Sequence, residues 1–314
     1  MDVPDQFPVR KTKPQKQAFR TAVQSYGERL GYVVTVEQGS FGARNLLLGD
    51  PEKAKYLVTA HYDTCAAMLL PNFITPCNVV LYLLYQFGLV LLMLIGAGAA
   101  GAAAGFLFGS AAVKWVSLTV YWILLFLLIV GPANKTNAND NTSGVVTLLE
   151  IAGTLPENQR HKVCFVLFDL EEAGLIGSAS YRRKHKKASD SQIVLNLDCV
   201  GDGDHLLMFP TKKLRNNRKR LTSLYRACGY FGKKSLLVHE QGKYVYPSDQ
   251  KHFPFGVGIC ALRKHKNTLF MSRIHTKKDT VLEQTNVNIL RAALTTFICC
   301  DEVNQERKMK NEAL

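Results

Sequence analysis

A long apolar segment constrains this chain more than any other feature of its sequence. From Val79 to Val130 there is no Asp, Glu or Arg, and Lys114 is the only ionisable cation. A bilayer core needs about 20 apolar helical residues, and two stretches fit, NVVLYLLYQFGLVLLMLI and VKWVSLTVYWILLFLLIV. The segment therefore predicts a hairpin of two transmembrane helices. The alternative is a core hairpin of a soluble protein, and the length of the segment argues against it.

Small residues separate the two apolar stretches, in the sequence GAGAAGAAAGFLFGSAA. This composition predicts a short turn region between the helices. Gly101, Gly105 and Gly109 recur at four-residue spacing, a pattern that lets two membrane helices approach closely. A flexible Gly/Ala linker is an equally good interpretation of the same residues.

Charge and cysteine usage predict a membrane protein whose soluble part faces the cytoplasm. The net charge of +14 is typical of proteins next to nucleic acid or an anionic membrane. We expect no nucleic-acid partner, because no nucleic-acid module is recognisable. Lys and Arg flank both ends of the apolar segment, which by the positive-inside rule puts both flanks in the cytoplasm. The eight cysteines lack C-x-x-C spacing, which argues against a disulfide framework or a cysteine zinc site. We therefore expect an integral membrane protein that contacts the bilayer through residues 78–131.

The remaining chain alternates between helical and strand patterns. Apolar residues at helical spacing predict helices at 15–32, 144–155, 174–187, 221–232 and 287–308. Short runs rich in Val, Leu, Ile and Tyr predict strands at 32–38, 43–49, 53–63, 162–169, 191–201 and 258–263. This alternation predicts an α/β fold with a mostly parallel, mixed sheet flanked by helices.

Polar groups that can bind metal follow several of the predicted strands. They are His61 and Asp63, Asp140, Glu171 and Glu172, Asp198, and His275. Ligands of α/β folds sit outside the carboxyl ends of the strands, so we expect these side chains to meet at one edge. Imidazole and carboxylate groups together suit hard or borderline divalent ions, and no thiolate is needed.

The motifs that carry these residues resemble a known family in the same chain order. AHYDT, NDNTSG, FVLFDLEEAGLIGS, LNLDCVG and HTKKDT are similar to the successive motifs of the M28 zinc aminopeptidases. The resemblance covers nearly the whole soluble part and implies that family's three-layer fold. It implies a discontinuous peptidase domain, 1–73 and 134–314. The hairpin, 74–133, is then an insertion between the first and second metal ligands.

The resemblance also implies five metal ligands and two zinc ions. One zinc would take His61 and Asp198, the other Glu172 and His275, and Asp140 would bridge them. Cobalt or manganese would also fit such ligands. His61 and Asp140 must lie on the same side of the membrane if both bind this metal pair. The two predicted spans between them satisfy this condition, because an even number of spans returns the chain to the side from which it left.

Two further carboxylates take catalytic roles in the same resemblance. Glu171 would be the general base that removes a proton from a water held between the metals. Asp63 would accept the second imidazole N–H of His61 and fix its tautomer. The implied activity is that of a metallopeptidase that removes residues from peptides with a free N-terminus. The implied position of the site leads us to expect peptide substrates near the inner leaflet.

Some positions leave alternatives open. Ser248 and Asp249 match a family S-D-H motif whose third residue is here Gln250, and either Tyr244 or Tyr246 would assist the oxyanion. Basic runs at 182–187 and 212–220 either contact lipid headgroups or form solvated surface. The alternative functions are a glutaminyl-cyclase-like acyltransferase, which needs one zinc, and a non-enzymatic receptor or scaffold. The sequence makes no prediction of an oligomeric state.

Overall fold

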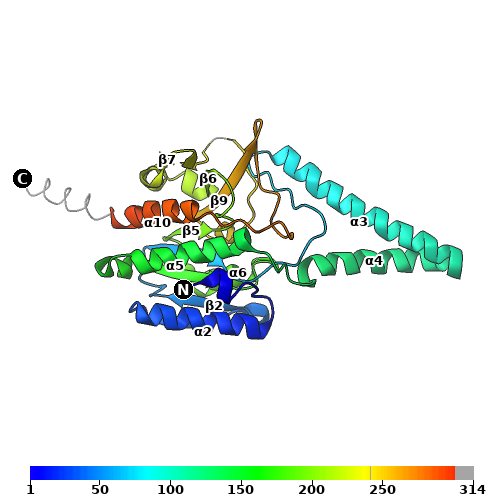
Figure 1. Ribbon diagram of the computed structural model, residues 1–314, viewed down its shortest axis with the longest axis horizontal. Coiled ribbons are helices and arrows are strands. Elements are labelled where there is room, and N and C mark those ends of the chain that lie inside the picture. The colour runs from blue at the N-terminus through cyan, green and yellow to red at the C-terminus, as the bar shows by residue number, and fades with distance from the viewer. Residues whose placement is uncertain (241, 301–314) are drawn as a thin grey trace, which may run out of the picture.

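A ten-stranded mixed sheet organises the part of the chain that this computed structural model describes, residues 1–240 and 242–300 (Figure 1). Its strands are β1 (Val34–Gln38), β2 (Arg44–Leu48), β3 (Tyr56–His61), β4 (Val163–Phe168), β5 (Ile193–Leu197), β6 (His205–Pro210), β7 (Gly229–Phe231), β8 (Lys234–Val238), β9 (Gly256–His265) and β10 (Thr268–Phe270). They follow the order β1-β2-β4-β3-β5-β9-β6-β8-β7, and β10 pairs with β9.

The centre of the sheet is parallel and its outer strands include antiparallel pairs. Strands β4, β3, β5 and β9 run parallel to one another, whereas β1, β2 and β6 join antiparallel. The register pairs His61 with Phe168, so β3 and β4 end at the same level. The predicted α/β fold with its mixed sheet is confirmed, and the loops after the central strands share one edge.

Helices cover both faces of this sheet. They are α1 (Val3–Gln6), α2 (Lys13–Arg29), α5 (Gly144–Thr154), α6 (Ile176–Lys184), α7 (Lys186–Ser189), α8 (Lys212–Arg215), α9 (Arg218–Leu224) and α10 (Gln284–Cys299), with α3 and α4 outside the domain. Because strand side chains alternate between faces, Val58 belongs to the core cluster that includes Phe19 of α2 and Leu148 of α5, whereas Leu57 belongs to the cluster that includes Tyr181 of α6. The result is the three-layer arrangement that the resemblance implies.

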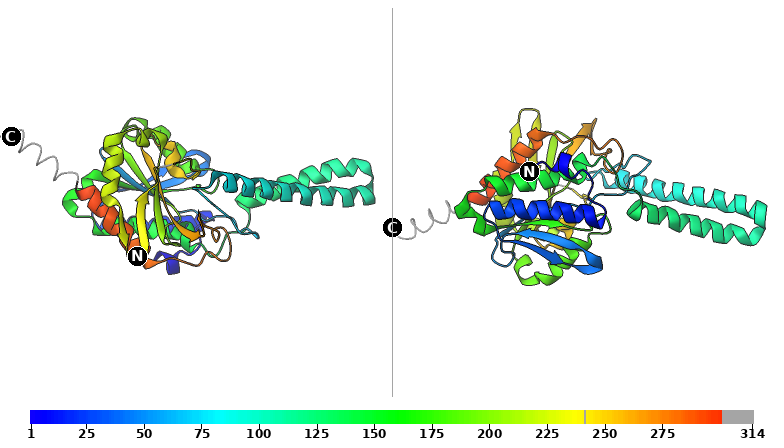
Figure 2. Two further views of the ribbon diagram at one scale, coloured as in Figure 1. Left: turned by 90° about the horizontal axis from the view of Figure 1, so that it is seen from above. Right: turned by 60° about the horizontal axis from the view of Figure 1, so that its bottom comes forward.

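A helical hairpin projects from one end of the domain. It consists of α3 (Val79–Phe108) and α4 (Ser110–Val130), and it leaves the domain on the side opposite the end of α10 (Figure 2). Both helices are long and apolar enough to cross a membrane, and almost none of their length is buried in the protein. A core hairpin of a soluble protein would be buried, so that alternative is not observed.

The predicted turn region between the two apolar stretches is wrong in extent. Helix α3 continues through the small residues to Phe108, because alanine has the highest helix propensity, and the chain reverses at Gly109 with φ 90°. A Cβ at Gly101 would lie 2.6 Å from the carbonyl oxygen of Val113. Gly101 and Gly105 therefore allow close packing of the two helices, Gly109 forms the turn, and the segment is not a flexible linker.

Two other predictions differ from the structure, and a third extends beyond the described residues. The predicted helix 221–232 is wrong at its end, because Tyr230 and Phe231 pair with β8 across a turn at Gly232. The predicted helix 174–187 breaks at His185. Residues 301–308 of the predicted last helix lie outside the described residues.

Each basic run has a residue that contacts a loop at the edge of the sheet opposite the hairpin. His185 contacts Glu52 in the loop before β3, and Arg220 donates to the carbonyl oxygen of Ser191, just before β5. The hairpin leaves from the other edge, after β3. These contacts favour the solvated-surface interpretation of the run 182–187. In the run 212–220, Arg215 instead contacts Gly242 and Tyr244, which flank Lys243 next to the start of the hairpin, so both interpretations stay open for that run.

Candidate metal centre

A cleft of about 320 Å³ opens at the carboxyl edge of the parallel strands. Six of the seven predicted site residues line it, namely His61, Asp140, Glu171, Glu172, Asp198 and His275. The seventh, Asp63, is buried beside them. The structure therefore brings together all the residues that the sequence singled out.

The first candidate ligand group consists of His61, Asp140 and Asp198. His61 is the last residue of β3, Asp198 follows β5, and Asp140 lies in the turn before α5. Nε2 of His61 lies 3.3 Å from Oδ1 of Asp140 and 3.6 Å from Oδ1 of Asp198. One imidazole and two carboxylates thus face a common point.

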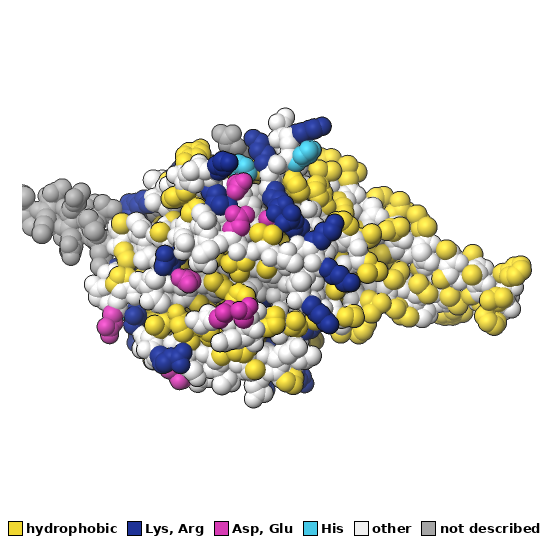
Figure 3. Space-filling model, in the orientation of Figure 1, with side chains coloured by type: hydrophobic (Ala, Val, Ile, Leu, Met, Phe, Trp, Pro, Cys, Tyr) yellow, Lys and Arg dark blue, Asp and Glu magenta, His cyan; other side chains and the backbone are white. Residues whose placement is uncertain are grey.

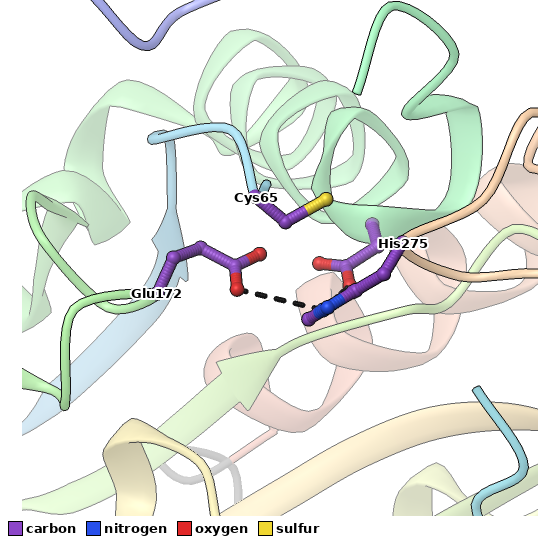
Figure 4. Close-up of side chains that lie close together, drawn as sticks. Cys65, Glu172 and His275 are labelled. Carbon is purple, nitrogen blue, oxygen red and sulfur yellow. Dashed lines mark ion pairs between the residues drawn. The ribbon is translucent and has the colours of Figure 1, made fainter. Parts of the chain in front are cut away.

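The second candidate group shares Asp140 with the first and adds Glu172, His275 and Cys65. Nε2 of His275 lies 2.9 Å from Oδ2 of Asp140 and 3.4 Å from Oε2 of Glu172. Figure 4 shows the side chains of Cys65, Glu172 and His275 pointing toward one another. Asp140 therefore presents one carboxylate oxygen to each histidine, the arrangement expected of a bridging ligand.

Asp63 holds the loop that carries the two adjacent glutamates. Its Oδ1 accepts the backbone N–H of Glu171 at 3.0 Å, and its Oδ2 accepts that of Glu172 at 3.2 Å. Nδ1 of His61 lies 3.6 Å from Oδ1 of Asp63, which is longer than a hydrogen bond. The hydrogen bond between Asp63 and His61 remains a prediction. The sequence did not indicate the two hydrogen bonds from the backbone of Glu171 and Glu172 to Asp63.

Asp279 holds the turn that carries Asp140. Its carboxylate accepts the backbone N–H groups of Asn139 at 2.7 Å and of Asp140 at 3.0 Å. Sequence reasoning gave Asp279 no role, although it lies in the quoted motif HTKKDT. The acidic side chain of Asp279 within that motif was a signal in the sequence that could have indicated a role at the site.

Burial of so many ionisable groups shifts their pKa values. Burial raises the pKa of Glu171 well above its usual range, and that of Glu172 is raised by burial and by Asp140. Burial alone would lower the pKa of His275, but Glu172 and Asp140 raise it to about 9. The two histidines lower the pKa of Asp140 against the effect of its burial. The charges of Asp140, Glu172 and His275 thus depend on one another.

The residues of the cleft fit a pair of divalent cations. Oε1 of Glu172 is buried without a hydrogen-bond partner among the described residues, a costly arrangement for a polar atom. Among the described residues that line the cleft, the four carboxylates Asp140, Glu171, Glu172 and Asp198 face one lysine, Lys251. Imidazole and carboxylate donors in two groups that share Asp140 suit two borderline divalent ions.

Tyr246, and not Tyr244, lines the cleft. The hydroxyl of Tyr246 donates to the carbonyl oxygen of Asp198 at 2.9 Å, whereas Tyr244 donates to Pro210. Gln250 donates to the carbonyl oxygen of Tyr246 at 2.8 Å and accepts from Asn196. Gln250, the residue that departs from the family motif, therefore contacts the backbone of Tyr246 and does not line the cleft.

Besides Asp279, three further residues of the site were given no role from the sequence. Cys65 belongs to the second ligand group, and Tyr82, from the first apolar helix, lines the cleft. Asp249 is fully buried, neither of its oxygens has a hydrogen-bond partner in the described part of the chain, and its charge raises the pKa of Glu171. Only Asp249 carried a signal, as part of the S-D-Q sequence.

The sequence model of Peptidase family M28 matches residues 124–297. The chain belongs to peptidase family M28. The match begins inside α4 and includes four of the five predicted metal ligands, all but His61. A search of curated proteins finds no match.

Several solved structures share the fold at low sequence identity. The glutaminyl cyclase of Porphyromonas gingivalis superposes with a TM-score of 0.57 at 15% identity, covering 94% of this chain and 93% of its own. A Zn-dependent exopeptidase from Parabacteroides distasonis gives 0.56 at 16%, with coverage of 94% and 93%. The LapA aminopeptidase of Legionella pneumophila gives 0.53 at 15%, with 94% and 69%. These neighbours include peptidases and a cyclase, so the shared fold does not choose between the two activities.

Proposed function

We propose that this M28 protein is a membrane-anchored zinc aminopeptidase that removes N-terminal residues from peptides. The observation that carries the proposal is the sharing of Asp140, whose two oxygens lie 3.3 Å from Nε2 of His61 and 2.9 Å from Nε2 of His275. Such sharing suits two metal ions with one carboxylate between them. A free amino terminus can then occupy a position beside one ion.

The ligand sets in this proposal follow the two groups of the cleft. His61 and Asp198 would hold one zinc, Glu172 and His275 would hold the other, and Asp140 would be shared between them. Bound zinc would polarise the scissile carbonyl and lower the pKa of the attacking water. Cobalt and manganese suit the same carboxylate and imidazole donors.

Glu171 is the general base in the proposed reaction. It lines the cleft, and burial raises its pKa, which brings a carboxylate closer to the range where it exchanges protons at neutral pH. Glu171 takes the proton of the attacking water and delivers it to the leaving amine. Asp63 keeps Glu171 in place through its backbone N–H.

The membrane part of the proposal assigns residues 74–133 to the hairpin and residues 1–73 and 134–314 to the peptidase domain. Lys and Arg side chains form a line where the domain meets the apolar hairpin (Figure 3). Lys11 donates to the carbonyl oxygen of Ile129 at the end of α4, and Lys243 lies beside Val79 and Val80. Basic side chains at this level suit an anionic cytoplasmic leaflet. The peptidase domain therefore faces the cytoplasm, and residues 78–131 contact the bilayer.

The cleft itself lies next to the membrane in this arrangement. Tyr82, in the first turn of α3, lines the cleft together with Ile74, Met271 and Ile274. A substrate in the cleft thus contacts a residue of the membrane helix. We therefore expect substrates whose N-terminus lies close to the bilayer surface and whose N-terminal residue has an apolar side chain.

A glutaminyl-cyclase-like activity is the second candidate, and Asp249 is the observation that favours it. Cyclisation needs an acid rather than a water nucleophile, and burial raises the pKa of Asp249 to about 7. A protonated carboxyl group near Glu171 would provide that acid. A non-enzymatic scaffold is less well supported, since every ligand and the general base are present.

The test of the proposed function is hydrolysis of free and N-acetylated aminoacyl substrates by detergent-purified protein. We expect release only from free amino termini, loss of activity with chelator and recovery with zinc. Glu171→Gln should abolish release, whereas Glu150→Gln, at a partly exposed position of α5 where Glu150 pairs with Arg291, should not. Hydrolysis of acetylated substrates, or activity that survives the chelator, would contradict the proposal.

A further inference from the structure

We propose that Cys65 is an additional ligand of the second metal position, so that a thiolate joins Asp140, Glu172 and His275 there. This inference rests on the proposed metal centre and adds a donor that neither the sequence motifs nor the family match assigns. It makes the two metal positions chemically different from each other.

The geometry of the four side chains supports this ligand set. The sulfur of Cys65 and one ligand atom from each of Asp140, Glu172 and His275 all lie within 4.8 Å of one another. Cys65 is 1% exposed, and Figure 4 shows its side chain pointing to the space that Glu172 and His275 face. A single ion at the centre of such a group is within reach of all four donors.

The backbone of Cys65 is fixed from two sides. Its carbonyl oxygen accepts the N–H of Asn134, and the N–H of Ala67 donates to Pro132, so the segment pairs with the chain returning from α4. The N–H of Met68 donates to the carbonyl oxygen of His275 at 2.7 Å. The thiol and the imidazole are therefore held in register by a direct backbone hydrogen bond between their two segments.

The chemistry of the donors suits zinc. Zinc accepts thiolate, imidazole and carboxylate ligands in tetrahedral sites, and a soft thiolate disfavours manganese relative to zinc. The first group, His61, Asp140 and Asp198, contains no thiol. We therefore expect the position with Cys65 to select zinc or cobalt more strongly than the other position.

Absorption spectroscopy of the cobalt-substituted protein tests the inference. Full-length protein in detergent, with cobalt in place of zinc, should show a near-ultraviolet thiolate-to-cobalt charge-transfer band. Cys65→Ser should abolish the band while the visible cobalt bands show that metal is still bound. Cys199→Ser is the matched control, since Cys199 is a buried thiol that lines the same cleft, and it should keep the band. A wild-type protein without the band, or a band that persists in Cys65→Ser, would overturn the inference.

X-ray absorption at the zinc edge provides a second measurement that needs no substrate. The wild-type zinc protein should show a sulfur scatterer at about 2.3 Å, which Cys65→Ser lacks. The substitution should also weaken zinc binding at this position at least about tenfold. Bound zinc without sulfur would overturn only the role of Cys65, whereas absence of bound metal would overturn the proposed metal centre as well.

Discussion

Oδ1 of Asp63 accepts a hydrogen bond from the backbone N–H of Glu171 at 3.0 Å. This bond connects the loop after β3 to the loop after β4. The parallel register of the two strands brings these loops to the same level. Asp63 thus positions the proposed general base by its backbone and leaves the side chain of Glu171 free to face the cleft.

Asp63→Asn should lower kcat about 10- to 100-fold, the usual effect of removing a partner behind a metal site. An amide has one acceptor oxygen, so one of the two backbone bonds to the glutamate loop is lost. Steady-state kinetics with zinc in excess, together with metal content, measure this. An unchanged kcat would contradict the positioning role. Asp50→Asn, in an exposed loop, serves as the control.

Glu171→Gln and Glu172→Gln should fail in different ways although the residues are adjacent. Loss of the general base in Glu171→Gln should reduce kcat by about 10²- to 10⁴-fold and leave both metals bound. Glu172→Gln should lose metal from the second position. Metal content measured beside kcat separates the two. Equal metal loss in both variants would contradict the assigned roles.

The metal-free protein should lose stability as the pH rises from 6.5 to about 9. The pKa of His275 is raised from 6.5 to about 9, so its stabilising contribution is complete below 6.5 and is lost as the pH passes through 9. The raised pKa of Glu172 acts in the same direction, because the folded state then binds its proton more tightly than the unfolded state does. Thermal unfolding measured across this range with and without zinc is the test.

Zinc should remove most of this pH dependence of stability, since the ion would replace the protons that His275 and Glu172 bind in the metal-free protein. His275→Gln should flatten the metal-free profile, whereas His265→Gln, at an exposed position of β9, should not change it. A metal-free protein whose melting temperature rises between pH 6.5 and 9 would contradict the charge balance described for the cleft.

Gly101→Ala should destabilise the hairpin, and Gly98→Ala should not. A Cβ at Gly101 would lie 2.6 Å from the carbonyl oxygen of Val113, whereas nothing lies within 4 Å of one at Gly98. Overpacking of this kind costs about 1–3 kcal/mol. Thermal unfolding in detergent and protease sensitivity at the turn near Gly109 measure it. Equal effects of the two substitutions would contradict the close helix packing.

Removal of residues 79–130, with a short Gly/Ser linker from Asn78 to Gly131, should abolish a preference for membrane-bound peptides. Ile74 is kept because its backbone exchanges two hydrogen bonds with Met271. Anchoring enzyme and substrate to one surface raises their effective concentration, so we expect the full chain to favour vesicle-bound over soluble peptides by at least about tenfold. The same ratio for the full chain and the deletion form would contradict membrane-proximal turnover.

The sequence predicted the parts of this site that follow strand ends. His61 and Asp198 directly end or follow apolar runs that can only be buried strands, and the parallel register brings such positions to one edge. The hairpin was likewise predictable, since its length exceeds what a soluble core helix needs.

Other features depend on contacts between distant segments and left no local pattern. Cys65 joins the second ligand group because its segment pairs with Asn134 beyond the hairpin, and Tyr82 reaches the cleft through the direction in which α3 leaves the domain. Asp279 acts through backbone N–H groups about 140 residues away. The turn region was misjudged because Ala- and Gly-rich sequence continues a helix when a neighbouring helix packs against the glycines.

Incorporation of oxygen from labelled water tests the aminopeptidase account most directly. Peptides with several N-terminal residues, glutamine among them, are incubated with the zinc-loaded full chain in ¹⁸O-water and analysed by mass spectrometry. The account predicts free amino acids that carry ¹⁸O in their new carboxyl group. Unlabelled pyroglutamyl peptide formed with loss of ammonia, or no labelled amino acid from any peptide, would contradict it.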